Sequence, residues 1–332
     1  MNSLPSWELN IDQLKKPKKI SSLEVAIITQ NRSKYLTKAL ISLTKQTVTP
    51  KRIIIIDNAS KDNTKEVICS FEQFLPIKYL YEPNIGIPYA RNLALESSQE
   101  EILAFLDDDC ETSSDWLENM VKAHKQYANI TVIQGRSVSI PRESLFSIIA
   151  EFNRQLWIKN YLISGHKNYP KTFELTVLDT KNVSMKVDQI RRLHLKFEEN
   201  FVRGSDTEFA KRLLSKNQHI LFYPKAIVFH KERDNLGKFL IQSYLKGKAF
   251  RQIETKWPYE YRIPNKEIHF LDKSLIFVKY CLHYKHYLKT PVLFLLFLFN
   301  ELAFSFGKYY AKRTQAKKGL VFLNNAYSAN NI

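Results

Sequence analysis

The sequence predicts an α/β fold with a mainly parallel central sheet, followed by a helical, basic and apolar C-terminal extension. Short apolar runs alternate with helical patterns through the first part of the chain. Acidic residues follow two of these runs directly, at positions 57 and 107. Beyond residue 236 the pattern becomes helical and basic. Alternating strands and helices are typical of parallel sheets with right-handed crossovers.

Four short runs of apolar, mostly branched residues are the expected strands of the first half. They cover residues 23–29, 52–57, 77–82 and 101–107. Because these runs are apolar on both faces, they suit strands that are buried within a sheet. Amphipathic patterns between them predict helices over residues 33–46 and 64–74 and a third that runs from Pro88 through Arg91 and Leu95. Pro88 suits the first turn of the last helix.

After residue 109 the rhythm of the chain changes. The patterns predict helices over residues 116–127, 143–161 and 206–215, and strands over residues 131–140, 173–186 and 220–230. Such an arrangement predicts a mixed sheet that completes the first half.

The net charge of +17 over 332 residues implies an anionic partner, which is a phosphate ligand, a nucleic acid or an anionic membrane surface. From residue 241 onward fifteen basic and five acidic residues contribute +10 of this charge. The three cysteines are scattered and have no metal-type spacing, which favours a reducing compartment. Residues 1–20 are expected to be a polar N-terminal extension without a secretory signal.

The extension over residues 236–332 contains a strongly apolar segment. Residues 291–299 are purely apolar, and the apolar character continues after Asn300 and Glu301. The stretch of about 16 residues is shorter than the roughly 20 that a membrane-spanning helix needs. We therefore expect an interfacial or re-entrant helix flanked by Lys285, Lys289 and Lys308. A buried core or oligomer helix is the alternative.

The sharpest local feature is the run Asp107-Asp108-Asp109, which directly follows an apolar strand. In an open α/β sheet, ligands bind outside the carboxyl ends of the strands. Adjacent carboxylates repel one another, and their hard oxygen atoms suit Mg²⁺ or Mn²⁺, which would also bridge a diphosphate. The alternative is a solvated acidic turn.

Two further strand ends carry candidate ligand-binding residues. Asp57 and Asn58 end the second strand, and Gly86 follows the third. Arg91 lies in the next helix, where its guanidinium suits a phosphate or a base. The alternatives are an ordinary strand-to-helix loop for the first pair and a surface helix position for Arg91.

Taken together, these segments resemble the family 2 glycosyltransferases of the GT-A fold. The matching segments are Val25–Arg32, Asp57–Thr64, Asn84–Gly86 with Ala90–Asn92, and Phe105–Asp109. Their order and spacing agree with the family, and the resemblance covers roughly residues 23–230. It implies a nucleotide half over about 21–110 and an acceptor half over about 111–235.

The resemblance also implies a role for each matching residue. Thr29 would contact the nucleotide base, Asp57 would hydrogen-bond it, Arg91 would support the base or phosphates, and Asp107 would face the ribose or base. The remaining residues implied in nucleotide-sugar binding are Asn31, Arg32, Asn58, Gly86 and Asp108. Asp109 and His230 would hold Mn²⁺ or Mg²⁺.

The family's general base lies in an acidic pair before a helix. Here that pair is replaced by Ser205-Asp206, so that only Asp206 is left to take the proton from an acceptor hydroxyl. The alternatives for Asp206 are a helix cap and, because of the altered pair, an inactive fold.

The resemblance implies an inverting transfer of a sugar from a nucleotide-diphosphate donor, most simply a UDP-sugar, to a glycan or lipid-linked acceptor. The expected location is the cytoplasmic face of an anionic membrane. A nucleotidyltransferase is a rival, but the loop Thr29–Ser33 lacks the glycines that such an enzyme uses. A basic nucleic-acid-binding or membrane-binding protein is a second rival. No nucleic-acid partner is expected, because such binding would not explain the strand-end acids.

Overall fold

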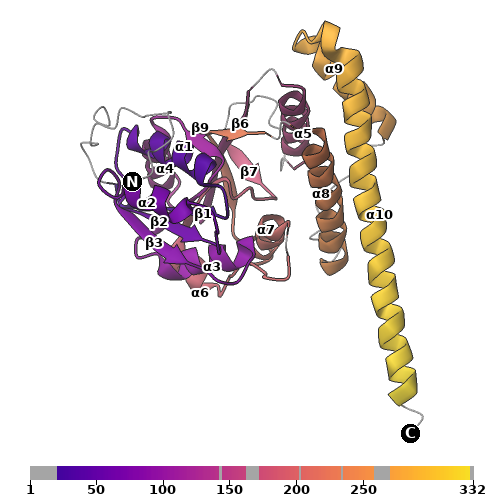
Figure 1. The fold of residues 1–332 in the computed structure, drawn as a ribbon, viewed down its shortest axis with the longest axis horizontal. Helices are drawn as coiled ribbons and strands as arrows, with labels where there is room; N and C mark the ends of the chain where they lie inside the picture. Colours follow the sequence, from indigo (N-terminus) through magenta and orange to yellow (C-terminus); the bar gives the residue numbers. More distant parts are fainter. Residues whose placement is uncertain are drawn as a thin grey trace.

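The computed structural model describes residues 21–141, 144–161, 172–201, 203–232, 235–257 and 270–329. The chain forms an α/β part followed by a group of long helices beside it (Figure 1). The extension expected over residues 1–20 lies outside the described residues.

The four strands expected in the first half are present. They are β1 (Leu23–Thr29), β2 (Arg52–Asp57), β3 (Ile77–Tyr81) and β4 (Ile102–Asp107). They lie in the order β3-β2-β1-β4 and are all parallel. The helices between them are α1 (Ser33–Thr44), α2 (Thr64–Phe71) and α3 (Ile87–Ser97). Because the strands are parallel, their carboxyl ends all lie at one edge of the sheet.

The second half extends the same sheet to nine strands in the order β3-β2-β1-β4-β8-β6-β9-β5, with β7 beside β9. Its strands are β5 (Cys110–Thr112), β6 (Val132–Ile140), β7 (Phe173–Leu175), β8 (Asn182–Lys186) and β9 (Ile220–Lys231). Its helices are α4 (Trp116–Gln126), α5 (Leu145–Tyr161), α6 (Val187–Arg192) and α7 (Ser205–Ser215). Strand β8 runs antiparallel to both β4 and β6, so the sheet is mixed as expected.

The strand expected over residues 173–186 is wrong as a single element. It divides into β7, which pairs with β9, and β8, which lies between β4 and β6. The intervening residues 176–181 lead from the edge of β9 to the position between β4 and β6, and they include Asp179 and Lys181. An apolar run alone does not reveal that its two ends pair with different strands.

Helices cover both faces of the sheet. One core cluster joins alternate residues of β1 and β2 to Leu36 and Leu40 of α1 and to Trp116 of α4. A second cluster, on the opposite face of the sheet, joins the other alternate residues of β1 and β2 to Ala90 of α3 and Phe209 of α7. This burial on both sides explains why the strands are continuously apolar.

The C-terminal helices are α8 (Leu236–Lys256), α9 (Phe270–His283) and α10 (Thr290–Ala329). Helix α10 runs along α8 on the side away from the sheet (Figure 1). The two backbones come close at Gly247 and Gly307, since a Cβ atom on Gly247 would lie 1.9 Å from the carbonyl oxygen of Phe304. A buried hydrogen bond of 2.6 Å from Ser243 to Asn300 joins the same helices.

Helix α8 also contacts the α/β part. A Cβ atom on Gly204, just before α7, would lie 3.4 Å from Ala249 and 3.1 Å from Ile253. Lys256 forms ion pairs of 2.9 Å with Glu198 and 3.0 Å with buried Glu208 of α7. The extension therefore lies directly against the start of α7, where Asp206 is found.

Candidate functional site

The parallel register brings the strand-end residues together at one edge of the sheet. Thr29 is the register partner of Asp57, and Ile28 is the partner of Asp107. Both aspartates end their strands, as the sequence predicted. The acidic run of residues 107–109 therefore starts beside the end of β1, one strand away from Asp57.

Arg32 binds two acids of this run. Its guanidinium forms an ion pair of 2.7 Å with Asp108 and one of 2.5 Å with Asp109. The Thr29 hydroxyl donates a hydrogen bond of 2.9 Å to Asp108. Asp108 is buried and is committed to these two partners, whereas Asp109 has a second oxygen that faces His230 at 3.5 Å. Asp108 thus holds the loop together, and Asp109 faces the site.

Burial and mutual repulsion perturb the acids. Burial raises the pKa of Asp107 to about 6, and the neighbouring Asp109 adds to this increase. Burial also raises the pKa of Asp108 to about 7, although Arg32 opposes the change. For Asp109 burial acts in the same direction, but His230 and Arg32 hold its pKa well below the ordinary value. The cluster therefore has less positive charge around it than its three carboxylates require.

His230 is oriented like a metal-binding histidine. Its Nδ1 lies 3.0 Å from Glu232, and its Nε2 faces Asp109. A carboxylate on the far ring nitrogen is the usual support for a metal-ligating imidazole. Within the described residues, no three His, Cys, Asp or Glu side chains converge closely enough to hold a metal ion by themselves. Asp109 and His230 would be the two protein ligands for Mn²⁺ or Mg²⁺ that this arrangement offers.

The loops after β1 and β2 support one another. Asp57 is buried and accepts hydrogen bonds from the Ser60 backbone at 2.9 Å and from the Tyr79 hydroxyl at 3.1 Å. Asn31 has a positive φ of 53°, and its side chain accepts a hydrogen bond of 2.6 Å from the Lys61 backbone. These contacts hold the expected base-binding loop in one conformation.

Asn58 uses its side chain to position the loop after β3. Its amide donates to the carbonyl oxygens of Glu82 and Asn84, and its oxygen accepts from the Gly86 backbone at 2.8 Å. Gly86 has φ 152°, a conformation that residues with a side chain rarely adopt. Asn58 and Gly86 therefore shape the entrance to α3, on which Arg91 lies.

Arg91 connects the two halves of the site. It is buried, its guanidinium lies 5.3 Å from the ring centre of Phe197, and it donates a hydrogen bond of 3.0 Å to Ser205. It is therefore not an exposed helix residue, which was the alternative considered from the sequence.

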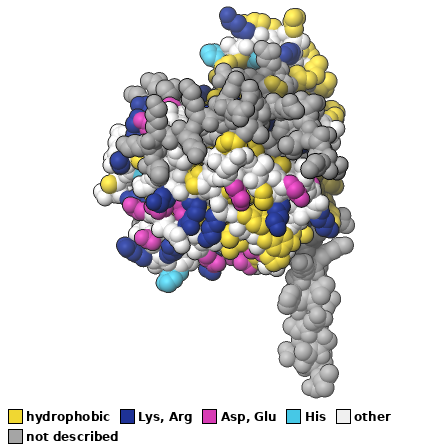
Figure 2. All heavy atoms as spheres, turned by 60° about the vertical axis from the view of Figure 1, so that its left-hand side comes forward, with side chains coloured by type: hydrophobic (Ala, Val, Ile, Leu, Met, Phe, Trp, Pro, Cys, Tyr) yellow, Lys and Arg dark blue, Asp and Glu magenta, His cyan; other side chains and the backbone are white. Residues whose placement is uncertain are grey.

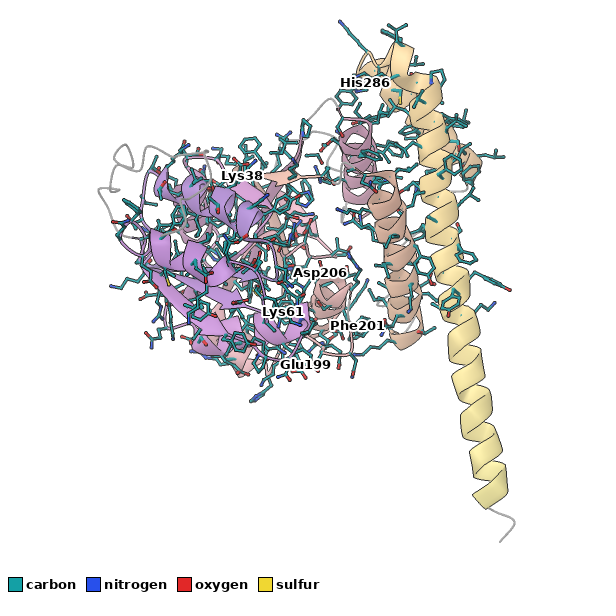
Figure 3. The ribbon with its side chains drawn as sticks, viewed as in Figure 1. Lys38, Lys61, Glu199, Phe201, Asp206 and His286 are labelled. Atoms are coloured by element: carbon teal, nitrogen blue, oxygen red, sulfur yellow. The ribbon has the colours of Figure 1, made fainter. Side chains whose placement is uncertain are left out.

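Asp206 lies in the first turn of α7 and is half-buried (Figure 3). The preceding Gly204 has φ 77°, so the chain turns sharply before the helix. Burial raises the pKa of Asp206, while Arg91 opposes the increase. The carboxylate accepts a hydrogen bond only from the backbone of Thr207 among the bonds formed by described residues. Asp206 is thus available to accept a proton.

Three charged residues near these groups were not predicted. Glu232 binds His230 and follows it by two residues at the end of β9. This spacing, which puts two side chains of an extended chain on the same face, was the sequence signal that could have revealed Glu232. Asp179 and Lys181 form an ion pair of 2.7 Å before β8. The charges of this pair act on the pKa of Asp206 and of Asp107, so the pair lies near both. No sequence signal indicated that residues 176–181, between β7 and β8, lie near Asp107 and Asp206.

Comparison with known proteins agrees with this geometry. The model of glycosyl transferase family 2 matches residues 24–191, just over half of the chain. Chondroitin synthase from Escherichia coli is 26% identical over 261 residues, which is 75% of this chain and 36% of that protein. The chain spans about a third of the length of the first curated relatives that it matches.

Two solved structures share the fold. A mannosyltransferase from Pyrobaculum calidifontis in complex with GDP-Man and Mn²⁺ has a TM-score of 0.61 at 13% identity, covering 90% of this chain and 89% of that one. TarS residues 1–349 from S. aureus in complex with UDP-GlcNAc has a TM-score of 0.53 at 16% identity, covering 78% and 71%. The fold is therefore the GT-A fold expected from the sequence, and the chain is a glycosyltransferase that belongs to glycosyl transferase family 2.

Proposed function

We propose that this enzyme transfers a sugar from a nucleotide-diphosphate donor to an acceptor hydroxyl with inversion at the anomeric carbon. The observation that carries the proposal is the hydrogen bond from Arg91 to Ser205. It joins the helix expected to bind the donor to the residue beside Asp206. The expected base is therefore adjacent to the expected donor site, and one of its carboxylate oxygens accepts no hydrogen bond from the part of the chain that the structure describes.

In the proposed reaction the acceptor oxygen forms a bond to the anomeric carbon while Asp206 takes its proton. The bond between that carbon and the phosphate oxygen breaks, and the nucleoside diphosphate leaves with the electron pair. Because the attack is in line with the leaving group, the anomeric configuration inverts. The raised pKa of Asp206 brings this carboxylate closer in basicity to the proton that it accepts.

The donor is proposed to bind at the ends of β1, β2 and β4. Thr29 and Asp57 would face the base, Asp107 the ribose or base, and Arg91 the base or phosphates. The loops that contain Asn31, Arg32, Asn58, Gly86 and Asp108 hold these residues in place through the contacts described above. A UDP-sugar is the preferred donor, and the similar structures bound to UDP-GlcNAc and GDP-Man support a nucleotide sugar of this type.

Asp109 and His230 would hold Mn²⁺ or Mg²⁺ beside the donor diphosphate, and the similar mannosyltransferase contains Mn²⁺. When bound, the cation would offset the charge that develops on the leaving diphosphate. In the absence of a cation, Arg32 neutralises part of the negative charge of residues 107–109.

A glycan or lipid-linked acceptor in polysaccharide or glycoconjugate synthesis is the proposed partner. The similarity to chondroitin synthase supports this class. Helix α8 packs beside Gly204, so the extension borders the site on the side of Asp206.

The C-terminal helices are proposed to associate peripherally with an anionic membrane at its cytoplasmic face. One outward stripe of α10 is apolar and at least half exposed; it consists of Val292, Leu295, Phe299, Leu302, Phe306 and Tyr309. These residues recur every three or four positions, so they lie on one face of the helix. Such a long apolar face is unusual in water and needs a partner.

The neighbouring α9 and the turn after it extend this surface. Leu271 is 74% exposed and Leu288 is 98% exposed, and Lys285 and Lys289 lie beside Leu288. Hydrophobic side chains also gather near the α9 end of the molecule in Figure 2. Lysines beside apolar residues favour a membrane surface with anionic lipids over a neutral one.

Residues Tyr287–Lys312 form the one helical segment among the described residues that is long and apolar enough to cross a membrane. Helix α10 continues well beyond the apolar run that the sequence showed. We retain the interfacial arrangement, because one side of the segment is occupied by α8 and by the core shared with α5 and α9.

The enzymatic proposal is tested by a donor-hydrolysis screen across UDP-, GDP- and dTDP-sugars, with Mn²⁺, Mg²⁺ or a chelator. We expect one nucleotide class to be hydrolysed and the chelator to stop the reaction. Proton NMR of the product made with the productive donor and a simple glycoside acceptor reports the new anomeric configuration. A product that retains the donor's configuration would contradict the proposed single displacement.

A further inference from the structure

Lys246 of α8 lies on the helix face that meets the catalytic part of the molecule. Ala249 and Ile253 on this face contact Gly204, two residues before Asp206. Lys246 precedes them by three and seven residues, so it projects from the same side of α8, one turn further along. Its side chain therefore borders the site on the side of Asp206 that is covered by the extension.

Lys246 makes no ion pair with any residue in the described part of the chain. Lys246 is exposed to solvent. Desolvation by the surrounding protein nevertheless lowers the pKa of its ammonium group, and the positive charges of Lys181 and Arg203 lower this pKa further. Glu232 and Asp179 act in the opposite direction. Lys246 is thus an accessible cation with other cations near it.

The two acids that act on Lys246 already have cationic partners. Asp179 pairs with Lys181 at 2.7 Å. Glu232 accepts from Arg154 at 3.2 Å and from His230 at 3.0 Å. Neither acid is left to neutralise Lys246. An accessible ammonium group with like charges around it is a binding position for an anion.

We propose that Lys246, with the positive charges of Arg203 and Lys181 nearby, binds an oxyanion carried by the acceptor, either a phosphate or a carboxylate close to the reacting hydroxyl. This inference rests on the proposed function, because it takes Asp206 as the base. It narrows the acceptor to an anionic glycan or a phosphate-bearing carrier. A compact ammonium group such as Lys246 suits either oxyanion as a point charge.

The location separates this position from the donor site. The donor residues Thr29, Asp57 and Arg91 lie at the ends of β1 and β2 and on α3. Lys246 lies on α8, beyond the start of α7. An acceptor whose hydroxyl reaches Asp206 from that side passes Lys246 and Arg203. The donor nucleotide does not.

The experiment uses the full chain saturated with UDP and Mg²⁺, into which inorganic phosphate or acetate is titrated in a calorimeter. The variants are Lys246→Gln, Lys246→Arg and, as a matched control, Lys248→Gln, which removes an exposed lysine from another face of α8. Loss of one charge-assisted contact should weaken phosphate or acetate binding about tenfold in Lys246→Gln. Lys246→Arg should restore most of it, and Lys248→Gln should match the wild type.

The affinity for UDP is measured with the same proteins. We expect it to be equal in all four, and stronger binding of phosphate or of acetate identifies the anionic group of the acceptor. Anion binding that is absent from the wild type, or unchanged in Lys246→Gln, would overturn the proposal. So would a variant that loses UDP affinity but not anion affinity, because Lys246 would then serve the donor. A wild type that binds anions but none of UDP, GDP and dTDP would refute the proposed function and leave this binding position standing.

Discussion

Arg91 on α3 donates a hydrogen bond of 3.0 Å to the hydroxyl of Ser205, the residue that directly precedes Asp206. The same guanidinium lies over the ring of Phe197. One buried arginine thus fixes the start of α7 relative to the donor half. Where the family resemblance leads one to expect an acid, a serine provides this contact with a neutral hydroxyl. This hydrogen bond therefore joins the proposed donor site to the proposed base.

Ser205 is predicted to act as a positioning residue for Asp206. Ser205→Ala removes the acceptor of the Arg91 bond, and we expect kcat to fall about three- to tenfold with little change in the KM for the donor. Ser205→Thr, which keeps the hydroxyl, should restore most of the rate. Steady-state kinetics measure both effects, with Ser215→Ala at the other end of α7 as the control. Equal losses in the alanine and threonine variants would indicate a packing role only.

The raised pKa of Asp206 predicts the pH dependence of the reaction. The base works only when it is deprotonated, so kcat should fall as the pH is lowered through the pKa of Asp206 in the folded enzyme. Because burial raises this pKa, the decline should begin at a higher pH than for an exposed aspartate. The measurement is a kcat profile between about pH 4 and 8 at saturating metal. In Asp206→Glu the pH at which kcat falls should shift. If the profile of this variant is the same as that of the wild type, the fall of kcat in acid reports the protonation of another group.

Glu24 at the start of β1 should stabilise the fold at neutral pH. It is buried and binds Arg52 on β2, the Ser98 hydroxyl at 2.5 Å and the Gln99 backbone at 2.9 Å. Burial alone would raise its pKa, but these hydrogen bonds bring it below the ordinary value of 4.5. The stabilisation is therefore present above pH 4.5 and is lost as the pH falls through the lowered pKa.

The test of Glu24 is urea unfolding of wild type and Glu24→Gln. We expect the variant to lose about 2–3 kcal/mol in the free energy of unfolding at pH 7. The difference should shrink in acid. Glu66→Gln, at an exposed position of α2, serves as the control and should change little. A difference that stays constant down to the lowest pH at which the protein folds would show that the charge on Glu24 is not responsible.

The outward stripe of α10 is predicted to bind anionic membranes. Replacing Leu295 and Leu302 by serine removes two exposed apolar side chains without touching the face that packs on α8. Binding to vesicles that contain phosphatidylglycerol should weaken at least about tenfold in flotation assays, because apolar burial in the membrane is lost. Salt should weaken wild-type binding as well. Ile85→Ser, an exposed apolar position in the α/β part, is the control, and unchanged flotation of the double variant would exclude this face as the membrane contact.

The first half of the fold was predictable because its signals are local. Each buried parallel strand is a short apolar run, and the acids that follow β2 and β4 mark the ligand-binding edge. Asp57 and Asp107 could be assigned to one edge from this pattern alone. Parallel strands place their carboxyl ends together whatever the order of the strands.

The remainder of the site depends on long-range packing that local patterns do not contain. Asp179 and Lys181 enter the site because β7 and β8 pair with different strands. Helix α8, which carries Lys246, lies beside the site because it packs against Gly204. Similarly, the expectation for Arg91 as a binding residue could not include its bond to Ser205, since the two residues are 114 positions apart in the sequence.

We infer that the strand-end acids and Asp206 form one active site with divided roles. The most direct measurement compares nucleotide binding with donor turnover in Asp206→Asn and Asp109→Asn. We predict that Asp206→Asn binds the nucleoside diphosphate within about twofold of wild type while sugar transfer falls by about 10²–10⁴. Asp109→Asn should weaken metal-dependent binding and turnover together. Transfer by Asp206→Asn at the wild-type rate would contradict the account.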